Sequence, residues 1–76
     1  MVFERIQEVV AGHMDLEKDA ITMESRFVED IGADSLDVLQ LITELEEAFN
    51  IEFEPSELEQ MKTVADVVKH IEAANG

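Results

Sequence analysis

The chain has 76 residues, of which 5 are basic and 19 acidic, so its formal net charge is −14. So short a chain forms one small core and leaves little room for an enclosed active site. The charge would repel the phosphates of nucleic acid, so we expect no nucleic-acid ligand. The absence of cysteine excludes disulfides, thiolate metal sites and cysteine nucleophiles. It fits a reducing, cytoplasmic location, although a processed organelle protein would share these features.

The apolar pattern favours helices over strands. Glycine and proline are too few for a protein of sheets and turns, and no apolar run approaches the roughly 20 residues of a membrane span. Apolar residues recur instead at helical spacing in three stretches. We therefore predict an all-α fold with a single domain over residues 1–76. The domain should be a small antiparallel-type bundle of three longer helices and one short helix, with a long loop between the first and second helices.

The first predicted helix spans residues 2–14 and carries one apolar stripe. The stripe follows +3, +4, +4 spacing and consists of Phe3, Ile6, Val10 and Met14. Asp15 should end the helix, because aspartate tolerates the left-handed backbone conformation better than most residues. Residues 16–34 then form a connection that is long for a compact domain, and loops of that length are often functional. Three apolar anchors should pin this connection to the core: Leu16, Ile21 and Phe27.

The second predicted helix spans residues 35–49, with Asp34 as its N-cap. Its core-facing stripe consists of Val38, Ile42, Leu45 and Phe49, with Leu41 beside them. The opposite face consists of Leu36, Gln40, Thr43 and Glu47, with Asp37 and Glu44 beside them. Leu36 is therefore a large apolar side chain that we expect to be exposed, one turn from the helix start.

Two more helices are predicted in the last third of the chain. A short helix begins near Pro55 or Ser56, since proline suits the first helical position and the segment from Ser56 to Glu59 matches a capping box. Leu58 and Met61 of this region can contact the core. The last helix, residues 64–74, has three end signals, which are Thr63 as its cap, Asp66 at the third helical position and Asn75-Gly76 at its close.

Patterns for catalysis and metal binding are weak. Neither His13 nor His70 lies in a recognisable motif, and both are most simply ordinary surface or edge residues. No G-x-S-x-G nucleophile elbow is present. The acidic run at residues 29–34 lacks the ligand spacing of a calcium-binding EF-hand loop. The sequence therefore predicts no catalytic residue and no metal site.

The acidic residues are unevenly distributed along the chain. No lysine or arginine occurs between Phe27 and Met61, whereas acidic residues are frequent there. One interpretation is a solvated face that keeps the protein in solution. The other is a docking surface for basic partners, with fast and salt-sensitive association. The clustering around a long loop and an exposed Leu36 favours the docking surface.

Ser35 follows a glycine-containing loop and opens the second helix, so its hydroxyl should be exposed. Local physics alone would make it a helix cap, because serine is a preferred capping residue. The wider sequence indicates more, since F-V-E-D-I-G-A-D-S-L-D at residues 27–37 closely resembles the attachment segment of acyl carrier proteins. The resemblance continues through L-E-E-A-F at residues 45–49 and K-T-V at residues 62–64, and it covers essentially the whole chain.

This resemblance implies a single acyl carrier domain that carries acyl groups and is not an enzyme. Ser35 would hold a 4′-phosphopantetheine arm, transferred from coenzyme A by a phosphopantetheinyl transferase. The thiol of the arm would carry growing acyl chains as thioesters. The carrier, which we expect to be a monomer, would deliver these chains to the basic surfaces of fatty-acid synthesis enzymes.

The resemblance also implies two further sets of residues. Partner contacts are expected at Asp34, Leu36, Asp37, Gln40, Thr43, Glu44, Glu46 and Glu47. A deformable acyl pocket is expected to be lined by Val38, Ile42, Leu45, Phe49, Leu58, Met61 and Val64. Two alternatives stay open. A carrier of a specialised pathway, such as polyketide, lipid or amino-acid loading, would share the serine and the arm, whereas an unmodified acidic adaptor would need neither.

Overall fold

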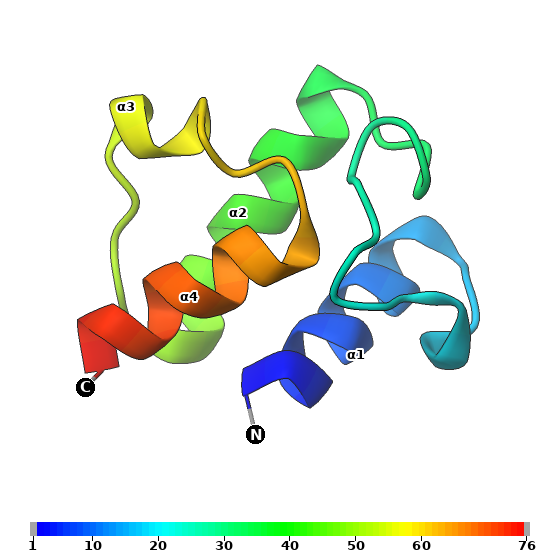
Figure 1. Cartoon of the computed structure of the whole chain (residues 1–76), viewed down its shortest axis with the longest axis horizontal. Helices are drawn as coiled ribbons and strands as arrows, with labels where there is room; N and C mark the ends of the chain where they lie inside the picture. The colour runs from blue at the N-terminus through cyan, green and yellow to red at the C-terminus, as the bar shows by residue number, and fades with distance from the viewer. Residues whose placement is uncertain (1, 76) are drawn as a thin grey trace.

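The computed structural model describes residues 2–75, and this part of the chain forms four α-helices. They are α1 (Val2–Met14), α2 (Ser35–Phe49), α3 (Pro55–Leu58) and α4 (Val64–Asn75), with a 3₁₀ turn, η1 (Lys18–Ala20), between α1 and α2. In the view of Figure 1, α3 and the α1–α2 connection lie on opposite sides of α2. The predicted bundle of three longer helices and one short helix is confirmed. No helix within residues 2–75 combines the length and apolar character needed to cross a membrane.

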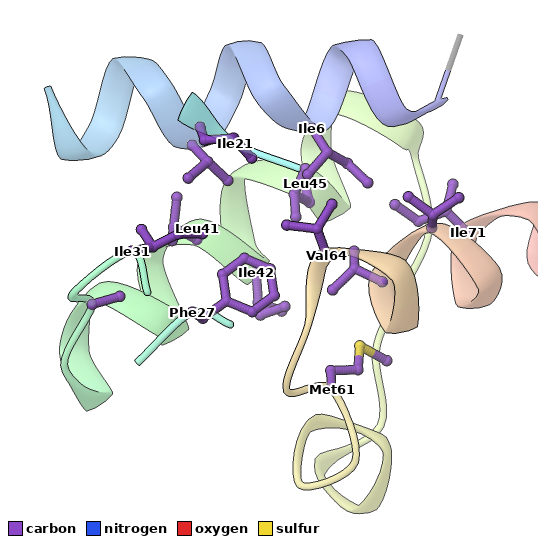
Figure 2. Packing of buried hydrophobic residues seen from close by; sticks show 14 of the residues in the cluster. Ile6, Ile21, Phe27, Ile31, Leu41, Ile42, Leu45, Met61, Val64 and Ile71 are labelled. Atoms are coloured by element: carbon purple, nitrogen blue, oxygen red, sulfur yellow. The ribbon is translucent and has the colours of Figure 1, made fainter. Parts of the chain in front are cut away.

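The core forms where the apolar stripes of the three longer helices meet. α1 packs against both α2 and α4, and Figure 2 shows Ile6, Leu45 and Val64 pointing into the same interior. These three side chains are fully buried, and so is Leu41, which the sequence placed only beside the stripe of its helix. Val38 and Phe49, at the two ends of that stripe, are half-buried and pack against the cluster. Burial of such side chains stabilises a fold by about 1.5–3 kcal/mol each.

The α1–α2 connection is fixed to the rest of the protein by main-chain bonds as well as by apolar anchors. Ile21 and Phe27 are buried, as predicted. The prediction for Leu16 is wrong, because its side chain is 39% exposed. Its amide closes the end of α1 by donating to the carbonyl of Ala11 (3.0 Å), a Schellman-type bond that turns the side chain outward. The amide of Phe27 donates to the carbonyl of Lys62 (3.0 Å), which ties this connection to the segment before α4.

The helix ends show which capping signals operate. Asp15 adopts the predicted left-handed conformation, with φ at 56°. The predicted box between Ser56 and Glu59 is wrong, because Pro55 occupies the first helical position and the carboxylate of Glu57 accepts a hydrogen bond from the amide of Glu54 (2.9 Å). The predicted end of the last helix involves Gly76, which lies outside the described residues.

The start of α4 has the reciprocal cap that the sequence predicts. The hydroxyl of Thr63 accepts from the amide of Asp66 (3.2 Å), and the carboxylate of Asp66 accepts from the amides of Thr63 (3.1 Å) and Lys62 (3.0 Å). The hydrogen bond from the Thr63 amide lowers the pKa of Asp66, and the amide of Lys62 adds to this shift. Since the carboxylate is the form that accepts these bonds, the cap depends on its charge.

Acid should remove this cap. Because the folded protein lowers the pKa of Asp66, its contribution to stability is complete above the unfolded-state value of about 3.8 and is lost as the pH falls through the folded-state value. We expect Asp66→Asn to lower the free energy of unfolding by about 0.3–1 kcal/mol at neutral pH. The difference should shrink below about pH 4. Urea titrations of both proteins across this pH range measure it, and a difference independent of pH would show that the charge does not stabilise the cap.

Truncation of two side chains of similar size on α2 should have different effects on the free energy of unfolding. Ile42 is 6% exposed, and Ile42→Ala should cost about 2–5 kcal/mol, because it removes buried methyl groups and leaves a cavity. Leu36 is 69% exposed, and Leu36→Ala on the same helix should change the free energy of unfolding by less than about 0.5 kcal/mol. Chemical unfolding of the matched pair measures both values. Equal losses in the two variants would contradict the assignment of inner and outer faces.

Candidate functional site

Ser35 is the first residue of α2, and its side chain is exposed. The cap of this helix is made by its neighbours. The Asp34 carboxylate accepts from the amide of Asp37 (2.9 Å), and the Asp37 carboxylate accepts from the amide of Asp34 (3.2 Å). This reciprocal arrangement is a capping box. Because two carboxylates make the cap, the hydroxyl of Ser35 is not needed for it and is presented to solvent.

The turn before Ser35 is held in one conformation. Gly32 has φ at 84°, a left-handed conformation that favours glycine. The amide of Ala33 donates to the carbonyl of Phe27 (2.8 Å), which closes the turn. The carboxylate of Asp30 accepts from both the amide (2.9 Å) and the Nε (3.0 Å) of Arg26. The hydrogen bond from the Arg26 side chain lowers the pKa of Asp30, so this clamp stays charged at neutral pH.

The position of Ser35 at a helix N-terminus suits a negatively charged group on its hydroxyl. The N-terminal end of a helix carries a partial positive charge and amides that lack partners within the helix. The carboxylates of Asp34 and Asp37 would repel such a group. An anion on Ser35 would add to their negative charge and so increase the attraction of this region for a basic protein surface.

The outer face of α2 contains a groove of about 380 Å³ beside these carboxylates. Four residues of the expected partner face line it, together with two that the sequence analysis left out; the six are His13, Leu36, Leu39, Gln40, Thr43 and Glu44. Leu36 and Leu39 are 69% and 53% exposed. The hydroxyl of Thr43 donates to the carbonyl of Leu39 (2.9 Å) within the helix, so the groove keeps an apolar character. The +3, +4 spacing of Leu36, Leu39 and Thr43 is the signal that could have identified Leu39.

Two other residues of the expected partner face lie farther along α2. Glu46 is half-buried, and its carboxylate accepts from the amide of Phe53 (2.8 Å), so it fastens the segment between α2 and α3. Glu47 is exposed and lies with Glu46 in a second, polar hollow that continues from Thr43 toward the end of the helix. The structure therefore divides the expected partner face into an apolar groove near Ser35 and a polar region beyond it.

The interior beside Ser35 contains a closed apolar seam between α2 and α3. Five of the residues expected in the acyl pocket line it together with Phe27 and Leu41; the five are Val38, Ile42, Leu45, Leu58 and Met61. Its volume is about 10 Å³, close to the minimum for one water molecule. Of the other two expected residues, Val64 belongs to the core and Phe49 packs against it, and neither lines the seam.

An open hollow of about 470 Å³ leads from Ser35 to this seam. The hollow and the seam share the side chains of Phe27, Val38, Leu58 and Met61. Figure 2 shows Met61 at the margin of the core, next to the turn of α3. Arg26 and Lys62 lie at the rim of the hollow. A flexible group attached to Ser35 could therefore reach the interior without crossing a helix.

Both histidines contact carboxylates of another helix. On His13, the Nδ1 lies 3.1 Å from Glu44 and the Nε2 lies 3.4 Å from Asp37. On His70, the Nδ1 lies 2.9 Å from Glu57, and the ring stacks on Phe53 with centroids 4.6 Å apart. Within residues 2–75, no group of three or more histidine, aspartate or glutamate side chains is close enough together to hold a metal ion.

Comparison with known proteins assigns residues 4–71 to the phosphopantetheine attachment site family. A relative from Clostridium acetobutylicum, named acyl carrier protein, is 45% identical over 96% of this chain and 95% of its own length. A protein of the same name from Wolinella succinogenes is 49% identical over 93% of each chain.

Solved structures extend the similarity to the fold. A provisionally assigned acyl carrier protein from Mycobacterium tuberculosis superposes with a TM-score of 0.91 at 32% identity, covering 97% of this chain and 99% of that chain. The acyl carrier protein from Enterococcus faecalis superposes with a TM-score of 0.80 at 29% identity, covering 95% and 91%. The long α1–α2 connection and the order of the helices are thus features of a known fold.

The crowding of negative charge should make the stability of this protein depend on salt. A net charge of −14 on 76 residues opposes the compact state through mutual repulsion of carboxylates. We expect the melting temperature to rise between about 10 mM and about 1 M NaCl, as the screening length falls from about 30 to about 3 Å. Millimolar Mg²⁺ should have a similar effect at lower ionic strength. Calorimetry measures the shift, and a melting temperature indifferent to both salts would contradict the repulsion.

Proposed function

This chain belongs to the acyl carrier proteins, and we propose that its Ser35 is the residue that receives the 4′-phosphopantetheine group of the family. The observation that carries the proposal is the exposed serine at the start of α2, whose hydroxyl is not used for capping because Asp34 and Asp37 form the cap. In the transfer, the hydroxyl oxygen forms a phosphoester bond to the pantetheine phosphate of coenzyme A. The pyrophosphate bond of coenzyme A breaks, the nucleotide portion leaves with the other phosphate, and the hydroxyl proton passes to a base of the transferase or to water.

The attached arm supplies a function that the chain itself lacks. The sequence contains no cysteine, so no side chain can form a thioester. Acyl carrier proteins carry acyl groups on the thiol of their phosphopantetheine group. The chain then acts as a carrier, and the chemistry on the acyl group is left to its partner enzymes.

The proposed partner surface is the outer face of α2 with the carboxylates around it. The apolar groove with Leu36 and Leu39 would receive apolar side chains of a partner, and the acidic residues beside it would attract lysine and arginine. The transferase and the enzymes of fatty-acid synthesis are the proposed partners. The alternative is that this chain serves a specialised pathway, whose carriers use the same serine and arm.

The proposed acyl pocket is the closed seam between α2 and α3. At about 10 Å³ it admits no acyl chain as it stands, so entry requires Leu58 and Met61 to move. Both lie within or just after α3, which has four residues and cannot be stable by itself. The flexible side chain of Met61 could adapt to acyl chains of different lengths. The hollow that joins Ser35 to the seam gives the chain its route.

Two further aspects of the proposal concern the whole chain. We propose that residues 1–76 form one carrier domain, which the match to relatives over nearly their full length supports, and that this domain acts as a monomer. The cytoplasmic location stays a prediction that rests on the absence of cysteine.

The decisive experiment is the intact mass of the protein before and after incubation with coenzyme A and a broad-specificity phosphopantetheinyl transferase. Wild type should gain the mass of one phosphopantetheine group, or arrive already carrying it on Ser35. Ser35→Ala should gain nothing, while its circular dichroism and unfolding curve stay close to those of wild type, because the side chain is exposed.

The controls separate the two classes of function. Ser56→Ala serves as the matched control, since Ser56 is also exposed near the start of a helix but lies on α3. It should be modified like wild type. A folded wild-type protein that is never modified would contradict the proposal and favour an acidic adaptor.

A further inference from the structure

We propose that His13 belongs to the docking surface and regulates it, so that protonation of this histidine weakens the binding of basic partners. The inference rests on the proposed function, because it concerns the surface by which the carrier meets its partners. His13 comes from α1, whereas the other residues that line the groove on the outer face of α2 belong to α2 itself. Its side chain is 20% exposed and is thus fixed between the two helices at the edge of the groove.

The geometry of the imidazole distinguishes its two charge states. The Nδ1 lies 3.1 Å from an oxygen of Glu44, and the Nε2 lies 3.4 Å from an oxygen of Asp37. A neutral imidazole has one N–H and can donate to only one of the two carboxylates, whereas an imidazolium has an N–H on each ring nitrogen. Histidine is the side chain that ordinarily changes charge between about pH 5 and pH 8. Only the Nε2 contact with Asp37 has the geometry of a hydrogen bond, whereas the Nδ1 contact with Glu44 becomes an ion pair when the imidazole is protonated.

Protonation of His13 engages the carboxylates that a partner would use. The Oδ2 of Asp37 already accepts from the amide of Asp34 (3.2 Å), and its Oδ1 is the atom that faces His13. With an imidazolium in place, both oxygens of Asp37 have internal donors, and the carboxylate of Glu44 has a positive charge 3.1 Å away. A lysine or arginine from outside would then have to compete with a positive charge that belongs to the carrier.

The charged groups that contact His13 are carboxylates. From α2 the imidazole faces Asp37 and Glu44, with the neutral Gln40 along the same groove. On its own segment Asp15 follows and is exposed. No lysine or arginine is among the described residues that line the groove, so His13 is the lining residue that can carry a positive charge.

The test compares three forms of His13 in the full chain. His13→Gln keeps a polar side chain without the charge, and His13→Lys carries a positive charge at every pH of the experiment. The second-order rate constant for modification of each apo protein by the transferase is measured at low salt between about pH 8 and about pH 5.5. The rate of wild type is divided by that of each variant at the same pH, which cancels the titration of the transferase itself.

Wild type should match His13→Gln at the alkaline end and approach His13→Lys at the acidic end. The rate of wild type relative to His13→Gln should fall by about three- to tenfold across the range, as expected for one or two exposed ion pairs. The fall should diminish at high salt. Titration of the His13 ring by NMR should show the same midpoint as the change in rate.

His70→Gln is the matched control, because His70 contacts Glu57 and Phe53 and does not line the groove. It should keep the pH dependence of wild type. A constant ratio of wild type to His13→Gln, or loss of the pH dependence in His70→Gln, would overturn the role of His13 and leave Ser35 modified as proposed. Absence of modification in wild type at every pH would overturn the proposed function and this inference with it.

Discussion

The reciprocal cap between Asp34 and Asp37 is the interaction on which the rest of the structure depends. It fixes the first residue of α2 and so the place of Ser35 at the start of this helix. The apolar stripe of the same helix then turns Ile42 and Leu45 into the core and leaves Leu36 outside. Because this cap is made by the side chains on either side of Ser35, the hydroxyl of Ser35 is not needed to cap the helix. One local interaction thus sets both the start of α2 and the exposure of the proposed attachment residue.

Negative charge has opposite effects on stability and on recognition in this protein. Each carboxylate on the surface of so small and acidic a chain adds repulsion, and a phosphodiester on Ser35 would add more. The repulsion is offset locally, by backbone amides at Asp34, Asp37 and Asp66 and by the guanidinium of Arg26 at Asp30. These local contacts do not neutralise all of the carboxylates, since the net charge of the chain is −14. A basic partner surface of the kind proposed above would complete the neutralisation, so the repulsion that destabilises the isolated chain would favour association.

The sequence predicted those features that depend on residues close together in the chain. Helix spacing gave the bounds of α1 and α2, and the capping signals at Asp34 and Thr63 operate as expected. Features that depend on distant contacts were harder to predict. Leu16 looks like an anchor by type, but the turn at Asp15 points it outward. His13 carries no local motif, and only the packing of α1 on α2 places it between two carboxylates. The division of the partner face at Glu46 likewise depends on a contact with Phe53.

The closed seam beside Ser35 would serve as the proposed acyl pocket only if the short helix α3 moves. A permanently empty cavity of about 100 Å³ would cost roughly 2 kcal/mol at about 24 cal/mol per Å³, a large part of the stability of so small a domain. A seam of about 10 Å³ avoids that cost in the empty protein. An entering acyl chain would gain about 0.8 kcal/mol for each buried CH₂, so each added methylene offsets more of the cost of displacing α3. A ligand shifts an equilibrium only by its difference in affinity for the two states. Opening should therefore increase with the length of the acyl chain, and the weakness of the four-residue α3 is what keeps the required length short.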